Sequence, residues 1–179
     1  MVYNEAKGYL FVAGQEGIYG RIAFFKETIE GDFEHIQKFE LLYKCQINAM
    51  AYNENHNVLY TGGYDGKMIV WAKDKEKKFV EFQTISDHKK NFTKLIYNAP
   101  TNELFSACND TSTIFVWKSK PLKKNLEKTQ TLEIKGHTVS DMVYNKEKGM
   151  LFACNTNITL TIFKRGQTGK FEIFQEIDD

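Results

Sequence analysis

An eleven-residue phrase at the start of the chain returns, with three changes, near its end. Residues 1–11 read MVYNEAKGYLF and residues 142–152 read MVYNKEKGMLF. A tandem repeat constrains the fold more than composition does, because each copy must bury its apolar surface against a neighbouring copy. If the phrase marks a true repeat, other and unrelated residues should recur with the same period.

Three further marks share a period of about 46 residues. A Tyr-Asn pair, an aromatic residue that ends an apolar run, and a glutamine each occur four times. The tyrosines are Tyr3, Tyr52, Tyr97 and Tyr144, the aromatic residues are Phe25, Trp71, Trp117 and Phe163, and the glutamines are Gln37, Gln83, Gln130 and Gln175. Because the marks are different residue types, their agreement predicts four units within one domain, at residues 1–40, 41–85, 86–134 and 135–179.

Each unit contains short β-rich runs separated by polar or glycine-containing breaks. In the second unit the runs are residues 47–53, 58–63, 67–73 and 79–85. In the third unit they are residues 92–98, 103–109, 112–118 and 129–134. No window shows a helical period, and aromatic residues make up 14% of the chain against two prolines, which favours strands. We therefore expect an all-β fold of four four-stranded antiparallel blades, the unit of a β-propeller.

The third unit resembles the WD40-repeat propellers. In that family a histidine before the first strand, a hydroxyl residue on the second, an aspartate in the next turn and a tryptophan ending the third form a hydrogen-bonded tetrad. The matching residues of the third unit are His88, Ser106, Asp110 and Trp117. The second unit keeps part of the tetrad, with a tyrosine at the histidine position: Thr61, Asp65, Trp71 and Tyr43.

A histidine, a serine and an aspartate also suggest a hydrolase triad, but nothing places Ser106 on a nucleophile elbow. The resemblance implies that the tetrad ties a turn to the blade. The other histidines and the three cysteines lack metal-site spacing, and the chain has no phosphate-binding loop. We expect no enzymatic activity, cofactor, metal or small-molecule substrate.

The resemblance implies a non-catalytic scaffold that binds other proteins within a larger assembly. Partners of this family usually meet the face made by the loops before each first strand and by the turns between second and third strands. An aromatic residue beside a charge is a common energetic anchor in such interfaces. The candidate partner-binding residues are Tyr43, Tyr64, Lys89, Lys90 and Asn91.

The alternative is a module that binds an acidic surface, such as tubulin, a phosphoinositide membrane or RNA. The segments that join third and fourth strands are rich in lysine in three units, and in a propeller they emerge on one face. This candidate basic rim consists of Lys73, Lys75, Lys77, Lys78, Lys118, Lys120, Lys123, Lys124, Lys164, Arg165 and Lys170. The same lysines also fit solvated loops that maintain solubility. The net charge of +1 disfavours a dedicated nucleic-acid binder, and we expect neither a nucleic acid nor a membrane as the partner.

Cysteine usage indicates a reducing compartment, so we expect a cytoplasmic protein. The abundance of Lys, Asn, Ile, Phe and Tyr suggests an A+T-rich genome, and associates the chain loosely with cytoskeletal or ciliary assemblies. Four units are fewer than the seven or eight blades with which WD40 rings commonly close. We therefore expect an incomplete ring, completed by further blades from missing sequence, from another chain or from a second copy.

Overall fold

The structure is a computed structural model that describes residues 1–17, 19–40, 45–109, 111–119, 125–136 and 138–178. Its strands form four antiparallel sheets of four strands each, in chain order, which confirms the all-β prediction. The first sheet contains β1 (Val2–Asn4), β2 (Tyr9–Glu16), β3 (Tyr19–Glu27) and β4 (Phe33–Glu40). The second contains β5 (Ile47–Asn53), β6 (Val58–Gly63), β7 (Met68–Lys73) and β8 (Phe79–Ile85).

The third and fourth sheets repeat this arrangement. The third contains β9 (Phe92–Asn98), β10 (Glu103–Cys108), β11 (Thr113–Ser119) and β12 (Leu126–Glu133). The fourth contains β13 (Val139–Asn145), β14 (Met150–Asn155), β15 (Leu160–Arg165) and β16 (Phe171–Ile177). Strand β12 begins three residues before the predicted run at Thr129, because the buried Leu126 already pairs with Ser119 of β11.

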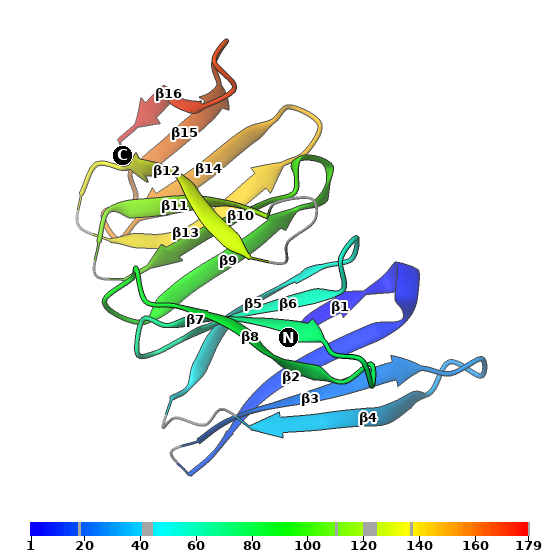
Figure 1. Cartoon of the computed structure of the whole chain (residues 1–179). Coiled ribbons are helices and arrows are strands. Elements are labelled where there is room, and N and C mark those ends of the chain that lie inside the picture. Colours follow the sequence, from blue (N-terminus) through cyan, green and yellow to red (C-terminus); the bar gives the residue numbers. More distant parts are fainter. Residues whose placement is uncertain (18, 41–44, 110, 120–124, 137, 179) are drawn as a thin grey trace.

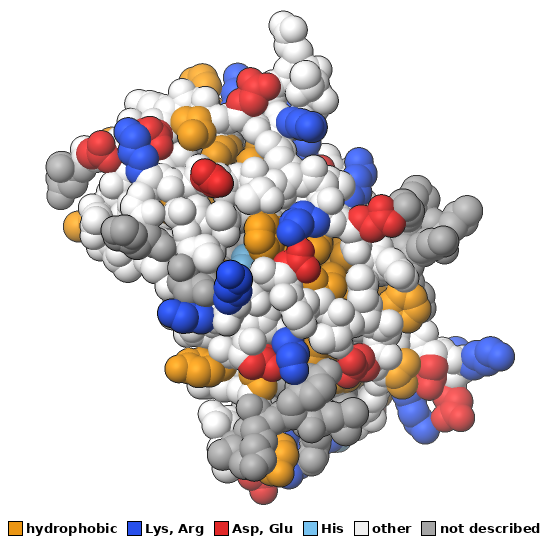
Figure 2. Space-filling view, turned by 60° about the vertical axis from the view of Figure 1, so that its left-hand side comes forward, with side chains coloured by type: hydrophobic (Ala, Val, Ile, Leu, Met, Phe, Trp, Pro, Cys, Tyr) orange, Lys and Arg blue, Asp and Glu red, His pale blue; other side chains and the backbone are white. Residues whose placement is uncertain are grey.

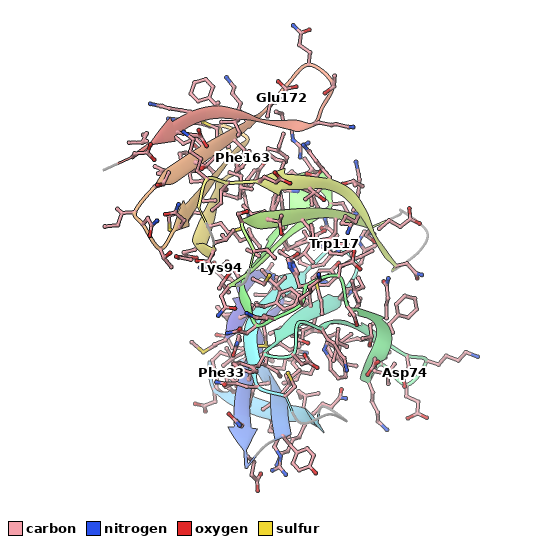
Figure 3. The ribbon with its side chains drawn as sticks, turned by 90° about the vertical axis from the view of Figure 1, so that its left-hand side faces the viewer. Phe33, Asp74, Lys94, Trp117, Phe163 and Glu172 are labelled. Carbon is pink, nitrogen blue, oxygen red and sulfur yellow. The ribbon has the colours of Figure 1, made fainter. Side chains whose placement is uncertain are left out.

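The sheets stack one upon the next and do not close into a ring (Figure 1). Figure 3 shows the same order, with Phe33 in the lowest sheet, Trp117 in the middle and Phe163 near the top. Three apolar clusters fill the spaces between neighbouring sheets. Strands β6 and β10 lie inside the stack and are buried on both faces, whereas β14, in the last sheet, is fully buried only at alternate residues. Each sheet thus depends on its neighbours for a complete core.

In three of the four sheets the asparagine of the Tyr-Asn mark closes the turn between the first and second strands, whereas Asn98 of the third sheet makes no such bond. The side-chain oxygens of Asn4, Asn53 and Asn145 each accept a hydrogen bond from the backbone N–H three residues later, at 2.9–3.1 Å. Such a bond satisfies a turn donor locally, which is a common role of asparagine. The repeated mark therefore encodes a repeated turn.

The aromatic and glutamine marks flank one β-bulge that all four sheets contain. In each sheet the register between third and fourth strands shifts immediately before the marked aromatic residue. In the third sheet, for example, Val116 pairs with Gln130 while Trp117 pairs with Lys128. A bulge twists its strand locally and redirects side chains. Two of the three sequence marks thus have a single structural cause.

The marked glutamine connects its sheet to the following one. Gln83 Nε2 donates to the carbonyl oxygen of Leu126 at 3.2 Å, and the N–H of Leu126 donates to Gln83 Oε1 at 2.9 Å. Gln37 binds both main-chain groups of Phe79 in the same way, and Gln130 binds those of Phe171. We call this paired contact the glutamine clamp. It satisfies the peptide groups of the residue that begins each following outer strand.

Replacing Gln83 with alanine should lower the free energy of unfolding by about 1–3 kcal/mol, because the peptide groups of the buried Leu126 would lose both partners. Gln167→Ala, in an exposed loop, is the matched control and should change stability by less than about 0.5 kcal/mol. Urea denaturation measures both effects. Equal effects of the two substitutions would contradict a structural role for the clamp.

Candidate functional site: the turn face of the second and third sheets

Three of the four tetrad residues predicted in the third sheet meet one another. Trp117 Nε1 donates to Ser106 Oγ at 2.7 Å, and His88 Nε2 lies 2.8 Å from the same oxygen. All three side chains are buried, and the His88 ring stacks on Phe115 with centroids 4.5 Å apart. Asp110 lies outside the described residues. The hydroxyl can accept from the indole and donate to the imidazole, so this arrangement links the loop before β9 to β10 and β11.

The second sheet also has polar contacts at its turn and at the loop before its first strand, but they involve different atoms. Trp71 Nε1 donates to Thr61 Oγ1 at 2.9 Å, which reproduces the indole–hydroxyl bond of the third sheet. Asp65 is exposed, and its Oδ1 accepts from the N–H of Lys67 at 3.1 Å and from the thiol of Cys45 at 3.2 Å. Tyr43, expected at the histidine position, lies outside the described residues.

The thiol of Cys45 is a structural donor that sequence reasoning missed. Burial raises its pKa, so the thiol stays protonated and can donate to the Asp65 carboxylate. A Cβ at Gly63 would come within 2.5 Å of the Cys45 sulfur and 2.7 Å of Asp65 Oδ1. Because Gly63 has no side chain, the thiol and the carboxylate can approach each other. In the sequence, only the position of Gly63 within the repeat could have indicated this contact.

In the fourth sheet Asn155 was also missed by the sequence reasoning. Its Nδ2 donates to the carbonyl of Lys135 at 2.7 Å, and its Oδ1 accepts from the N–H groups of Asn157 and Thr159. One amide thus connects the turn after β14 to the loop before β13. The sequence did offer a signal, since Asn155 follows Cys154 as Asn109 follows Cys108 in the third unit.

The turn after β6 lies directly against the loop before β9. Gly66 has a φ of +77°, and a Cβ there would come within 2.6 Å of the carbonyl oxygen of His88 and 2.9 Å of the backbone of Lys89 and Lys90. Tyr64, two residues earlier, is 62% exposed, and Lys89 and Lys90 are also exposed. The structure therefore brings together three of the five candidate partner-binding residues.

The other two candidates do not add an exposed side chain to this surface. Asn91 is half-buried, and its carbonyl accepts a hydrogen bond from the N–H of Asn109 at 3.0 Å, so its backbone supports the loop. Tyr43 lies outside the described residues. We call Tyr64, Lys89 and Lys90 the turn-face patch. Figure 2 turns this side of the stack forward and shows basic, acidic and apolar side chains interspersed over it.

The loops that join third and fourth strands lie on the opposite side of the stack from the turns between second and third strands (Figure 1). Several of their basic groups are engaged within the molecule. Lys73 Nζ lies 4.8 Å from the Tyr9 ring centroid, and Lys78 pairs with Glu76 at 2.9 Å. Arg165 pairs with the buried Glu103 and lies over Phe171.

The remaining rim residues divide between exposed and undescribed positions. Lys75, Lys77, Lys118, Lys164 and Lys170 are exposed. Three rim lysines lie outside the described residues, namely Lys120, Lys123 and Lys124. Among the described rim cations, Lys73, Lys78 and Arg165 are therefore engaged with groups of the chain itself.

Among the described residues no group of three or more His, Cys, Asp or Glu side chains could hold a metal ion. No helix in the described ranges is long and apolar enough to span a bilayer. The described cysteines are all free thiols.

Ser106→Ala should lower the free energy of unfolding by about 1–3 kcal/mol, because the buried Trp117 N–H and the His88 ring would lose their shared partner. The exposed Ser86→Ala is the matched control, with an expected change below about 0.5 kcal/mol. Chemical denaturation followed by tryptophan fluorescence checks both. A Ser106→Ala protein as stable as the control would show that the cluster contributes nothing to stability.

Comparison with known proteins agrees with this architecture. Residues 37–72 match the model of the family "WD domain, G-beta repeat". These residues run from the clamp glutamine of β4 to Ala72 in β7, and include Thr61, Asp65 and Trp71. No curated protein sequence matches the chain.

Solved structures match over nearly the whole chain at low identity. A protein from Lactobacillus plantarum has a TM-score of 0.74 and 14% identity, covering 98% of this chain and 56% of its own. A putative 6-phosphogluconolactonase from Bacteroides uniformis has a TM-score of 0.76 and 15% identity, covering 99% and 53%. Sqt1 from Saccharomyces cerevisiae has a TM-score of 0.64 and 11% identity, covering 74% and 35%.

These identities establish similarity of fold alone, and the chain spans about half the length of the first two structures. The sequence match and the structural similarity agree on one architecture. Residues 37–72 match a WD40 repeat, and the chain as a whole folds as an array of four propeller-type blades that do not close into a ring.

Proposed function

We propose that the chain is a non-catalytic interaction module, a scaffold in a larger protein assembly, and that its turn-face patch is the docking surface. The observation that carries this proposal is the direct packing of the Gly66 turn against the loop of His88 to Lys90. This packing places the exposed ring of Tyr64 and two exposed lysines on adjoining segments of backbone. An aromatic anchor beside positive charge suits a partner segment that carries both an apolar and an acidic side chain.

The internal bonding of the polar clusters supports a non-catalytic role. Ser106 is fully buried, and its hydroxyl already contacts both His88 and Trp117. A nucleophilic serine needs access to substrate and an oxyanion site beside it. WD40 repeats in general mediate protein–protein interactions, and that general role comes to this chain through the match at residues 37–72.

The basic rim receives less support as a docking surface. Lys73 packs on aromatic rings, and Arg165 is paired with Glu103, so these two cations serve the contacts between sheets. Exposed lysines remain in the loops after β7 and β15. Binding of an acidic surface there is the second candidate function, and the same experiment separates it from the first.

The chain covers roughly half of the first two matching structures, so the assembly should include further blades. We expect these blades, supplied by additional sequence, by another chain or by a second copy of this chain, to extend the same turn face. The partner surface could then continue beyond the patch described here. The proposal includes a location in the cytoplasm, in particular in cytoskeletal or ciliary assemblies.

The docking surface can be tested by affinity capture from cells with two charge-reversal variants. Tyr64→Ala combined with Lys89→Glu and Lys90→Glu should reduce recovery of the bound partners at least about tenfold. Lys75→Glu combined with Lys77→Glu, in the loop after β7, is the matched control and should retain them. The reverse pattern would favour the basic rim, and retention by both variants would contradict the turn-face patch.

The structural similarity to a putative 6-phosphogluconolactonase provides a test of the non-catalytic assignment. Purified protein should hydrolyse 6-phosphogluconolactone no faster than buffer, because Ser106, which has His88 beside it, is fully buried and already engaged with Trp117. Release of acid followed at constant pH measures the rate. Turnover above the spontaneous rate that is lost on mutation of a described residue would contradict the proposal.

A further inference from the structure

The outward face of the fourth sheet repeats, position by position, a face that is buried inside the stack. Phe105 pairs with Val116 in the third sheet, and Phe152 pairs with Ile162 at the same place in the fourth sheet. Phe152 is therefore the equivalent of Phe105, and Ile162 is the equivalent of Val116. Phe105 and Val116 are buried in the cluster between the third and fourth sheets. On the outward face, the residue equivalent to the buried Leu132 is Ile177, which is 43% exposed.

A shallow hollow marks the centre of this outward face. It has a volume of about 130 Å³ and is lined by Val143, Phe152, Cys154 and Leu160, among others. Val143 is 60% exposed. The equivalent surface of the third sheet packs against the fourth sheet, and Met142 of β13 belongs to the apolar cluster between them. The fourth sheet therefore has the shape and chemistry of a surface that accepts another blade.

Gln175 is the clamp glutamine of this end. It pairs with Ile162 as Gln130 pairs with Val116, immediately beside the bulge. The clamp glutamines inside the stack are half-buried, whereas Gln175 is exposed. Within the described part of the chain the Gln175 amide has no hydrogen-bond partner. Gln175 thus occupies the register position of a clamp glutamine, with an amide that offers both a donor and an acceptor.

Phe33 is the corresponding clamp target at the other end of the stack. It begins β4 and pairs with Glu27 as Phe79, which begins β8, pairs with Lys73. The targets inside the stack are buried, with Phe171 3% exposed, whereas Phe33 is 44% exposed. In the described part of the chain no glutamine binds its main chain. Tyr3 packs edge-on against it, as Tyr144 does against Phe171.

The two ends are therefore the two halves of one interface that occurs three times inside the stack. We infer that two copies of the chain bind head to tail, with Gln175 of each copy clamping the peptide groups of Phe33 in the other. The same contact forms twice and closes a ring of eight blades. A heterologous contact that closes after two copies leaves no open end, and eight blades lie within the range of known propellers.

Sedimentation velocity of residues 1–179 across a wide range of concentrations tests this inference. The expected species has twice the chain mass of 20.8 kDa and no larger polymer. Gln175→Ala should raise its dissociation constant on the order of a hundredfold, because two hydrogen bonds are lost at each of two interfaces. Phe33→Asp should abolish the dimer, since it places a charge in both apolar contacts.

Two substitutions nearby are matched controls. Gln167→Ala removes a glutamine from an exposed loop of the fourth sheet, and is the control for Gln175→Ala. Ile29→Asp inserts the same charge in an exposed loop of the first sheet, and is the control for Phe33→Asp. Both controls should leave the dimer intact. Circular dichroism verifies that each variant retains its strands. A monomer, an open-ended series of polymers, or a dimer that Gln175→Ala and Phe33→Asp leave unchanged would overturn the inference. These outcomes do not depend on whether the turn-face patch binds a partner.

Discussion

Each sheet of this protein has two apolar faces, and it can bury them only between two other sheets. The constraint is visible in the burial of individual strands, because β6 and β10 are buried along their whole length while β14 is half-exposed at alternate residues. A four-stranded sheet with two apolar faces has no stable existence alone in water. Stacking is therefore the folding principle of the chain, and every other feature serves to orient one sheet on the next.

The glutamine clamp shows how that orientation is achieved with polar groups. The bulge before the marked aromatic residue turns the glutamine of the fourth strand towards the next sheet. Its amide then satisfies both peptide groups at the start of that sheet's outer strand, where a purely apolar contact would leave them without partners. Apolar burial supplies most of the stability, and the clamp specifies one register between the sheets.

The turns beside the inner strands are tethered by chemically different groups in successive sheets. The third sheet uses a histidine, a serine and a tryptophan, the second adds the thiol of Cys45, and the fourth uses the single amide of Asn155. What these solutions share is a polar contact between the loop that enters the sheet and the second strand, the third strand or the turn between them. The residue types vary because a tether needs only a donor and an acceptor at the right distance.

Periodicity allowed much of the fold to be predicted from the sequence. Four of the eight runs predicted in the second and third units coincide with strand bounds, namely residues 47–53 with β5, 58–63 with β6, 79–85 with β8 and 92–98 with β9. Local chemistry explains this success, since alternation, turn residues and the asparagine that closes three of the four turns act over a few neighbouring residues. The tetrad positions His88, Ser106 and Trp117 could be assigned because a family pattern specifies them.

The remaining features depended on contacts between sheets. Nothing local indicates that Cys45 lies against Asp65, that Gly66 packs under Lys89, or that Arg165 is paired with Glu103, because each contact joins segments that only the stack brings together. The sequence alone determined the repeat, the four strands of each unit and the four recurring glutamines. Only the tertiary structure decided what those glutamines bind, because a bulge and a neighbouring backbone set the direction and the target of each amide.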